Sequence, residues 1–476
     1  MKDEEIIELV HKIGEIQCET NVIELKSSSK GVTEKIYDTI SAFSNQDMGG
    51  VIVFGINEEN YKPCGVLDAE LVQKRVGEQC EEMVPVVRPV LSCISIDGKK
   101  IVTAEVPSAD YSDRPVYWKK AGLTKGSWIR VGDMDKRMSD YEIYKYQAYK
   151  KGIHDDQRII ESDWALLDKN LLNHYLEQVT IGKRNLFEHV SQDKMLELFR
   201  ITQKEKPTLA AFLVFSQFPQ AIFNNLCVTA VVIPGTQRGD NLSDGTRFLD
   251  NKRINGSIPS ILSETMDFIL KNTANRTVID SSGVRNDVEQ YPPEAVREAV
   301  LNALIHRDYS VFSENSPVRV EIFTDRLEIT SPGGLYGRAR IESLGYESLE
   351  TRNSVLTSIL ETLKISENRY SGIPTMRNLL KRAGLPDPEF IDTGTTFKVI
   401  LRSAPNKSVE QALTETERQI LEYCRTPRTR KEIANHIGKT YNYVNSYLLK
   451  KMIMTGLLSL VKDENNKRNQ RLRSSY

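Results

Sequence analysis

The pattern of apolar and polar positions is clearest in residues 292–309, where it predicts one amphipathic helix. The segment opens with two prolines that suit a helix start, and apolar residues then recur at helical spacing over 295–304. Glu298 and Asn302 stand four residues apart within this pattern, so their side chains lie on one face. A carboxylate and a carboxamide on a buried helix need partners. A nucleotide site uses such a pair, because the amide oxygen can ligate Mg²⁺ while the carboxylate orients water.

Alternating apolar and polar residues predict strands after that helix. Residues 318–323 alternate, a turn follows at Asp325, and a second strand continues over 327–330. The segment 331–335 reads Ser-Pro-Gly-Gly-Leu and ends this strand with glycines that permit close backbone approach to a ligand. A closing strand is predicted over 393–401.

The middle of the chain carries weaker patterns and no predicted chemistry. A charged, Tyr-rich helix is predicted from Ser139 to about Gln157 as a connector. Residues 163–204 are predicted to be helical. The apolar runs Leu209–Phe215 and Cys227–Ile233 are predicted to be buried strands.

The N-terminal part begins with a strand that ends at Lys26, in which Glu24 and Lys26 share one face. An amphipathic helix through Phe43, a glycine turn over 44–50 and an apolar strand over 51–56 follow. An acidic turn completes the pattern, and a hairpin with Asp97-Gly98 at its turn comes later. Farther on, Trp128 and Arg130 could stack on a base or contact phosphate, although a core position is favoured for the tryptophan.

The C-terminal segment reads as three helices, a strand and a basic tail. It resembles a winged helix-turn-helix, whose third helix enters the major groove and whose wing touches phosphate. The resemblance implies that four residues of the third helix face base edges, namely Tyr441, Asn442, Asn445 and Ser446. It also implies backbone contacts by the basic residues Arg428, Arg430, Lys439, Lys467, Arg468, Arg471 and Arg473. A winged helix used for dimerisation or protein contact is the alternative.

Composition limits the class of protein. The chain has 476 residues, 39% of them hydrophobic and 27% charged, as in ordinary globular proteins with about three domains. No stretch is long and apolar enough for a membrane span, and the first residues lack a signal-peptide pattern. Six scattered cysteines without metal-binding spacing suit a reduced, cytoplasmic protein. The formal net charge is −1, so a polyanion partner is indicated only by the basic C-terminal segment.

The helix, strand pair and glycine segments of residues 292–401 together resemble the GHKL family of ATP-binding α/β sandwiches. The resemblance implies ATP with Mg²⁺ as cofactor, Asn302 as the metal ligand and Glu298 as the base of an ATPase. The other implied cofactor-binding residues are Ser331, Gly333, Gly334, Gly372 and Thr396. Ser331 stands where the family has an adenine-reading Asp, and only one glycine remains in Tyr370-Ser371-Gly372. Weak or absent ATP hydrolysis is therefore expected.

The N-terminal order of Glu-Leu-Lys, Ala-Phe-Ser-Asn, Gly-Gly and an acidic turn resembles the Schlafen AlbA-like domain. Many members of that family are nucleic-acid-binding parts of regulators. In the Schlafen branch, three acids form a metal-dependent RNase site, and the matching residues here are Glu19, Glu24 and Glu58. Asn57 stands where an Asp is common, which lowers the charge of the site and favours binding over cleavage.

These patterns together predict an α+β multidomain protein. The expected parts are an AlbA-like domain over 1–140, a helical connector over 141–205, a degenerate GHKL-type sandwich over 206–403 and a winged helix over 410–476. We expect a cytoplasmic, bacterial, DNA-binding transcriptional regulator that is nucleotide-responsive and dimeric, with RNA as a further partner and no membrane contact. The alternative is enzymatic: a Schlafen-like metal-dependent nuclease or an ATP-gated defence effector with weak ATPase activity.

Overall fold

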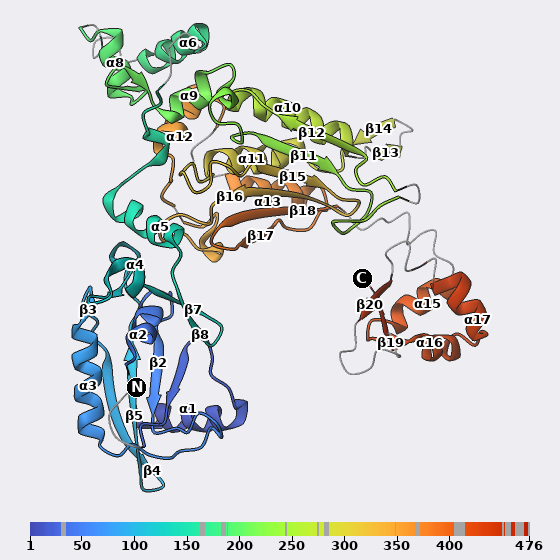
Figure 1. Cartoon of the computed structure of the whole chain (residues 1–476). Helices are drawn as coiled ribbons and strands as arrows, with labels where there is room; N and C mark the ends of the chain where they lie inside the picture. Colours follow the sequence, from blue (N-terminus) through green and yellow to red (C-terminus); the bar gives the residue numbers. More distant parts are fainter. Residues whose placement is uncertain are drawn as a thin grey trace.

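The computed structural model is a mixed α/β protein with several sheets (Figure 1). It describes residues 1–29, 35–161, 167–181, 187, 189–242, 245–273, 276–279, 285–347, 349–366, 372–403, 415–449, 452, 458–461 and 471–474. We use three names below: the N-terminal unit (residues 1–139), the central unit (residues 155–403) and the C-terminal unit (residues 415–474). Among the described residues, no helix is both long and apolar enough to cross a membrane.

The N-terminal unit is built on a four-stranded sheet in the order β1-β2-β5-β4. Its strands are β1 (Ile23–Lys26), β2 (Gly50–Phe54), β4 (Val90–Ile96) and β5 (Lys99–Val106). β1 and β2 run parallel and the other pairs are antiparallel. The Asp97-Gly98 turn between β4 and β5 has positive φ at both residues, as the predicted hairpin requires.

Helices cover both faces of this sheet because its strands alternate between two apolar cores. Val53 of β2 packs with α1 (Asp3–Ile16), whereas its neighbour Ile52 packs with α2 (Tyr37–Ser44) and α3 (Ala69–Glu81). Smaller elements complete the unit: β3 (Met83–Val84), η1 (Tyr111–Asp113), β6 (Tyr117–Trp118), α4 (Gly122–Gly126), β7 (Trp128–Val131) and β8 (Met134–Arg137). The predicted strand and helix around the glycine turn are thus confirmed, whereas the sequence pattern did not identify α1.

Helix α5 (Asp140–Lys151) lies between the N-terminal unit and the central unit (Figure 1). The central unit then begins with η2 (Asp155–Gln157), α6 (Lys169–Thr180), α8 (Gln192–Leu198), β9 (Thr202–Gln203), β10 (Lys206–Pro207), α9 (Leu209–Phe215) and η4 (Pro219–Ala221). Helices α6 and α8, which the sequence placed in a connector, share the apolar core of the six-stranded sheet.

The strand predicted over Leu209–Phe215 is wrong, because this segment is helix α9. Thr208 caps the helix by accepting a hydrogen bond from the Ala211 amide at 3.4 Å. All seven residues of α9 are buried, so neither helical nor strand periodicity is visible in the sequence. The strand predicted over Cys227–Ile233 is confirmed as β11 (Val228–Val232).

The central sheet has six strands in the order β12-β11-β15-β16-β18-β17. Besides β11 they are β12 (Asp250–Ile254), β15 (Val318–Ile322), β16 (Arg326–Pro332), β17 (Glu389–Asp392) and β18 (Thr396–Arg402). The other elements of the unit are α10 (Ile258–Asn272), β13 (Arg276–Ile279), β14 (Arg285–Val288), α11 (Pro293–Ile305), η5 (Ile341–Ser343), α12 (Ser354–Thr362) and α13 (Gly372–Arg382). The predicted helix at 292–309 and the two strands after it are therefore confirmed.

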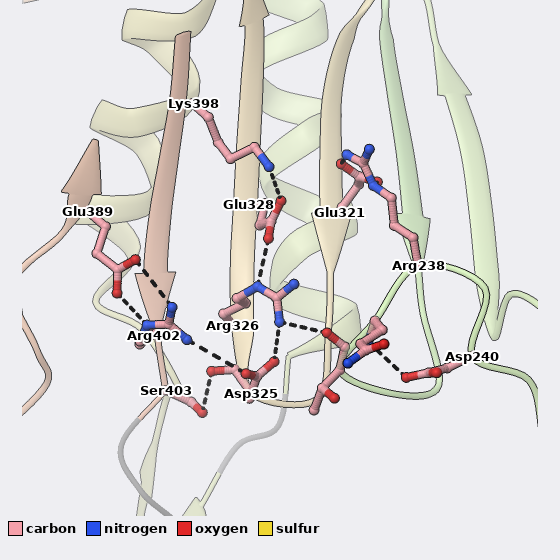
Figure 2. A network of polar contacts seen from close by, with 12 residues as sticks. Arg238, Asp240, Glu321, Asp325, Arg326, Glu328, Glu389, Lys398, Arg402 and Ser403 are labelled. Atoms are coloured by element: carbon pink, nitrogen blue, oxygen red, sulfur yellow. Dashed lines mark hydrogen bonds and ion pairs between the residues drawn. The ribbon is translucent and has the colours of Figure 1, made fainter. Parts of the chain in front are cut away.

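The two faces of the six-stranded sheet differ in chemistry because its strands alternate. Leu327, Ile329 and Leu401 point into the core that the helices cover. The opposite face carries paired charges, with the helices behind the strands (Figure 2). Glu328 accepts hydrogen bonds from Arg326 and Lys398 at 2.6 Å each, and Arg402 pairs with Glu389. Arg238 pairs with Glu321, so both buried glutamates of this face, Glu321 and Glu328, have cationic partners.

The C-terminal unit has its own small core, formed by Ile420, Ile433, Val444, Leu458 and Leu472 among others. Its elements are α15 (Glu415–Tyr423), β19 (Arg428–Thr429), α16 (Arg430–His436), α17 (Tyr441–Tyr443), the π-helical segment η6 (Val444–Leu449), β20 (Leu458–Val461) and β21 (Arg471–Ser474). The strands form a sheet in the order β19-β21-β20. Three helical segments followed by a hairpin are thus present, with a short strand that the sequence pattern did not predict.

Candidate functional site

A cavity of about 250 Å³ lies in the central unit between the helices and the sheet. Its sheet side includes two cross-strand pairs of β16 and β18, namely Ile329 with Val399 and Ser331 with Phe397. Helix α11 contributes Glu298, Ala299 and Asn302, and α13 contributes Gly372, Ile373 and Met376. The segment from Gly333 to Arg352 supplies most of the remaining lining.

The fold brings most of the residues predicted for a nucleotide site to this cavity. Six of the seven line it, namely Glu298, Asn302, Ser331, Gly333, Gly334 and Gly372. Thr396 is not among the lining residues, although its neighbour Phe397 is. The Thr396 amide instead donates to the Thr393 hydroxyl at 3.0 Å, which holds the turn before β18.

Glu298, Asn302 and Gly372 meet at one point of the cavity. The Asn302 amide nitrogen donates to Glu298 Oε1 at 3.0 Å, as the four-residue spacing predicts. A β-carbon on Gly372 would collide with the Glu298 carboxylate. Gly372 begins helix α13, and its lack of a side chain makes room for Glu298. Tyr370 and Ser371 lie outside the described residues.

The first glycine segment forms a supported turn at the cavity. Gly333 has a φ of +92°, which favours glycine, and its amide donates to the Thr395 carbonyl at 2.7 Å. The Asp392 carboxylate accepts from the amides of Leu335 and Gly394 at 3.1 and 2.7 Å. Asp392 therefore braces the turn from β17, a strand that the sequence pattern did not predict.

Ser331 has a structural partner in the described protein. Its hydroxyl donates to the Ala303 carbonyl of α11 at 2.9 Å, which ties β16 to the helix. A serine hydroxyl held in this way does not replace the ionised acceptor that an aspartate would present.

Sequence reasoning missed the charged pair of Asp308 and Arg352 beside the cavity. Arg352 lines the cavity, its guanidinium lies over the Tyr336 ring, and its Nη2 donates to the Gly334 carbonyl at 2.9 Å. Its Nη1 is 3.9 Å from Asp308, which also accepts from the Tyr141 hydroxyl at 2.6 Å. Asp308 follows the predicted helix directly in the sequence, but its partners Tyr141 and Arg352 are distant along the chain, so local patterns do not predict the pair.

The N-terminal glutamates converge on a lysine. Lys26 Nζ is 2.7 Å from Glu24 Oε1, while Glu19 accepts from the Leu25 amide and Glu58 from the Ser27 amide. Burial lowers the pKa of Lys26, but the hydrogen bond to Glu24 and the charges of Glu24, Glu58 and Glu19 outweigh burial and raise it. Of the three predicted acids, Glu24 therefore contacts the Lys26 ammonium, while Glu58 and Glu19 act on it through their charges.

Arg130 occupies a structural position in this unit. Its side chain is 1% exposed and lies 2.9 Å from both Glu24 and Asp135. The prediction that Arg130 could contact phosphate is therefore wrong, because two carboxylates already enclose it. Trp128 is half-buried, and the exposed Arg137 lies over its ring. Within the described residues, no three His, Cys, Asp or Glu side chains are grouped so that they could hold a metal ion.

The C-terminal unit presents part of its predicted nucleic-acid interface at the surface. Lys439, Tyr441 and Arg473 are exposed, whereas Arg428 and Arg430 are half-buried. The Arg428 guanidinium lies 4.6 Å from the centre of the Tyr423 ring. Lys467 and Arg468 lie outside the described residues, as do the side chains of Asn442, Asn445, Ser446 and Arg471.

Two family models match separate parts of the chain. Residues 19–139 match a family described as "Schlafen, AlbA_2". Residues 315–401 match an HATPase-type family described as "Putative ATP-dependent DNA helicase recG C-terminal". Both matches fall where the sequence motifs predicted AlbA-like and GHKL-type domains. A search of curated proteins found no match.

Two solved structures also show likeness to the chain. The crystal structure of the DIP2311 protein from Corynebacterium diphtheriae has 16% identity and a TM-score of 0.41, and the match covers 95% of this chain and 92% of that one. The N-terminal domain of a "Putative ATP-dependent DNA Helicase RecG-related Protein" from Nitrosomonas europaea has 28% identity and a TM-score of 0.23, with coverage of 28% and 92%. The chain is thus similar to a Schlafen AlbA_2 family in its N-terminal unit and to a RecG C-terminal family in its central unit.

Proposed function

We propose that the chain is a nucleic-acid-binding regulator whose central cavity takes a nucleotide-type ligand. The observation that carries this proposal is that one wall of the cavity is also the surface on which the N-terminal unit docks. A ligand that changes this wall would therefore change the arrangement of the units. The two family matches, one to an AlbA_2 family and one to a family named for an ATP-dependent DNA helicase, support both halves of the proposal.

The docking contacts come from the same segment that lines the cavity. Arg338 is 2.7 Å from Asp110, and Arg340 is 3.4 Å from Asp47. Tyr336 lines the cavity, and its ring packs edge-on against Tyr149 of α5 at 5.5 Å. This segment, residues 335–352, is called the docking wall below.

Helix α5 joins the docking wall to both units. Tyr111 of the N-terminal unit contacts the rings of Tyr146 and Tyr149 at 4.9 Å each. On its other side α5 supplies the Tyr141 hydroxyl to Asp308, and Lys145 donates to the Gly394 carbonyl at 3.0 Å. A shift of the docking wall would thus reach the N-terminal unit through packed aromatic rings.

The C-terminal unit supplies the nucleic-acid contact in this proposal. Its exposed residues Lys439, Tyr441 and Arg473 would meet the phosphate backbone and bases of duplex DNA as a winged helix does. Two copies in a dimer would read two half-sites, and the regulator would act on transcription.

The test measures binding of the full chain to duplex DNA over a range of salt concentrations. Lys439→Ala and Arg473→Ala should each weaken binding and reduce the slope of log affinity against log salt by about one per lost phosphate contact. Lys381→Ala, which removes an exposed charge from α13, serves as the matched control. Unchanged affinity and slope in both C-terminal variants would remove this unit from the DNA-binding role.

A metal-dependent nuclease is the second candidate function, and the observation that favours it is the contact of Glu24 with Lys26, whose pKa the charges of Glu58 and Glu19 also raise. The described carboxylates are not grouped to hold a metal ion, so a divalent cation would have to draw them together, and the Lys26 ammonium would stabilise the negative charge that develops on phosphate. The assay incubates structured RNA and single-stranded DNA with Mn²⁺ and the full chain, beside Glu19→Gln and Glu58→Gln variants. Cleavage by the parent that is lost in both variants would establish the nuclease. If none of the three proteins cleaves either substrate, the nuclease is excluded and the regulator remains the proposed function.

A further inference from the structure

The charges of the cavity do not suit a polyphosphate. The described residues that line it include three carboxylates, Glu298, Glu347 and Glu350, against one guanidinium, that of Arg352. His306 also lines the cavity and is exposed there; the protein atoms around it and the charge of Arg352 lower its pKa, so it does not add a second cation at neutral pH. Arg352 already shares its charge with Asp308 and the Gly334 carbonyl. Among the described lining residues, a triphosphate would therefore meet more negative than positive charge.

A helix N-terminus is the usual alternative to cations as a phosphate site, and here it is covered. Helix α13 begins at the cavity with Gly372, and the Glu298 carboxylate lies directly against that residue. An anion at the start of α13 would have to displace this carboxylate or lie beside it. The Mg²⁺ that Asn302 and Glu298 could hold would offset part of the repulsion, because their oxygens are suitable ligands.

The lining residues favour a ligand rich in hydrogen-bond donors. Ionised carboxylates only accept hydrogen bonds, and the cavity presents them from α11 and from the docking wall. Hydroxyl and amino groups can donate to carboxylates, whereas phosphate oxygens only accept. The apolar surfaces of Ile329, Val399 and Met376 suit a flat ring system.

The volume of the cavity also favours a nucleoside over a nucleoside triphosphate. The cavity volume of about 250 Å³ lies just below the range of typical ligand pockets, which is roughly 300–1,000 Å³. A nucleoside fills such a space, whereas a triphosphate tail would extend past the rim residues Glu347 and Glu350, which are exposed.

We propose that the cavity binds an uncharged, donor-rich heterocycle of nucleoside type in preference to a nucleoside triphosphate. This inference rests on the proposed function only in taking the cavity as the ligand site. It differs from the expectation of ATP with Mg²⁺, because the described lining residues fit the nucleoside part of that cofactor and disfavour its phosphates.

The test is calorimetric titration of the full chain with adenosine and with ATP, each with and without Mg²⁺. Adenosine should bind at least tenfold more tightly than ATP, and its affinity should not change with Mg²⁺. ATP with Mg²⁺ binding more tightly than adenosine would overturn the inference, and so would the absence of binding by both. DNA binding is measured separately, so failure of this inference is distinguishable from failure of the regulator.

Charge variants make the comparison specific. Glu347→Gln and Glu350→Gln should each raise ATP affinity several-fold while leaving adenosine affinity within about twofold, because repulsion falls as charge is removed. Glu342→Gln is the matched control, since Glu342 is exposed on the same docking wall but does not line the cavity. Equal effects at Glu342 and at the two lining residues would show that overall charge, and not the cavity, sets the preference.

Discussion

The Arg130 guanidinium is the clearest example of a residue whose role depends on its surroundings. It is enclosed by Glu24 and Asp135, and it donates to the Thr20 and Ile23 carbonyls. An exposed arginine beside a tryptophan could bind nucleic acid, but an arginine that neutralises two buried carboxylates has a structural role.

Replacement of Arg130 by Ala should destabilise the protein by about 3–5 kcal/mol, because it leaves two buried carboxylates without their shared cation. Urea denaturation followed by circular dichroism measures the change. Arg137→Ala, which alters an exposed arginine of the neighbouring strand β8, should stay within about 0.5 kcal/mol of the parent. Similar losses in the two variants would contradict the structural role given to Arg130.

Gly372 offers a second test at the residue scale. An alanine at the start of a helix normally stabilises it, by up to about 1 kcal/mol. Here the added methyl group would overlap the end of the flexible Glu298 side chain, which would have to rotate away, so Gly372→Ala should instead cost up to about 1 kcal/mol. The cost should largely disappear when Glu298→Ala is also present, as a double-mutant cycle in urea would reveal. A more stable Gly372→Ala variant would show that the two residues do not touch.

Helix α5 is the element that joins the two α/β units. Its hydrogen bond from Tyr141 to Asp308 spans the boundary between them, beside the Arg352 guanidinium. Burial raises the pKa of Asp308, but the charge of Arg352 and the Tyr141 hydroxyl outweigh burial and lower it. A lowered carboxyl pKa adds stability above the unfolded value of about 4, and this stability is lost as pH falls through the lower folded value.

Tyr141→Phe should therefore cost about 1–3 kcal/mol at neutral pH, since a buried carboxylate loses a donor. The difference from the parent should narrow as the pH falls from about 4 through the lower pKa that Asp308 has in the folded protein, where its carboxylate gains a proton. Denaturation curves at several pH values test both statements. Tyr346→Phe is the control, because that side chain is 77% exposed and should change nothing. A pH-independent difference would exclude the carboxylate as its cause.

At the scale of the whole molecule, the docking wall holds the N-terminal unit through two exposed ion pairs and a group of aromatic rings. Exposed ion pairs contribute at most about 1 kcal/mol each and are screened by salt. The Arg338→Ala and Arg340→Ala double variant should therefore keep its melting temperature but loosen the docking wall.

Hydrogen exchange over residues 335–352 and α5 measures that loosening. The exchange rate should be higher in the double variant than in the parent at low salt. At about 1 M salt the exchange rate of the parent should approach that of the variant, because the Debye length is then about 3 Å and the ion pairs are screened. Arg382→Ala, exposed on α13, should exchange like the parent. If exchange does not differ between parent and double variant, the ion pairs do not hold the units together.

The elements whose residues alternate or repeat could be predicted from the sequence alone, because the period of the apolar residues depends only on which face of an element is buried. The helix of Glu298 and Asn302 and the hairpin of β15 and β16 were predicted for this reason. The sequence also determined the nearness of Glu298 to Asn302, because four residues make one helical turn.

Contacts between residues that are distant along the chain could be identified only in the tertiary structure. Helix α9 is buried on every side and shows no period, so packing alone distinguished it from a strand. The pairing of Asp308 with Tyr141 and Arg352 and the enclosure of Arg130 by acids depend on how separate units pack. Glu298 likewise meets Gly372 only because α11 and α13 lie together over one sheet, and local sequence does not encode that contact.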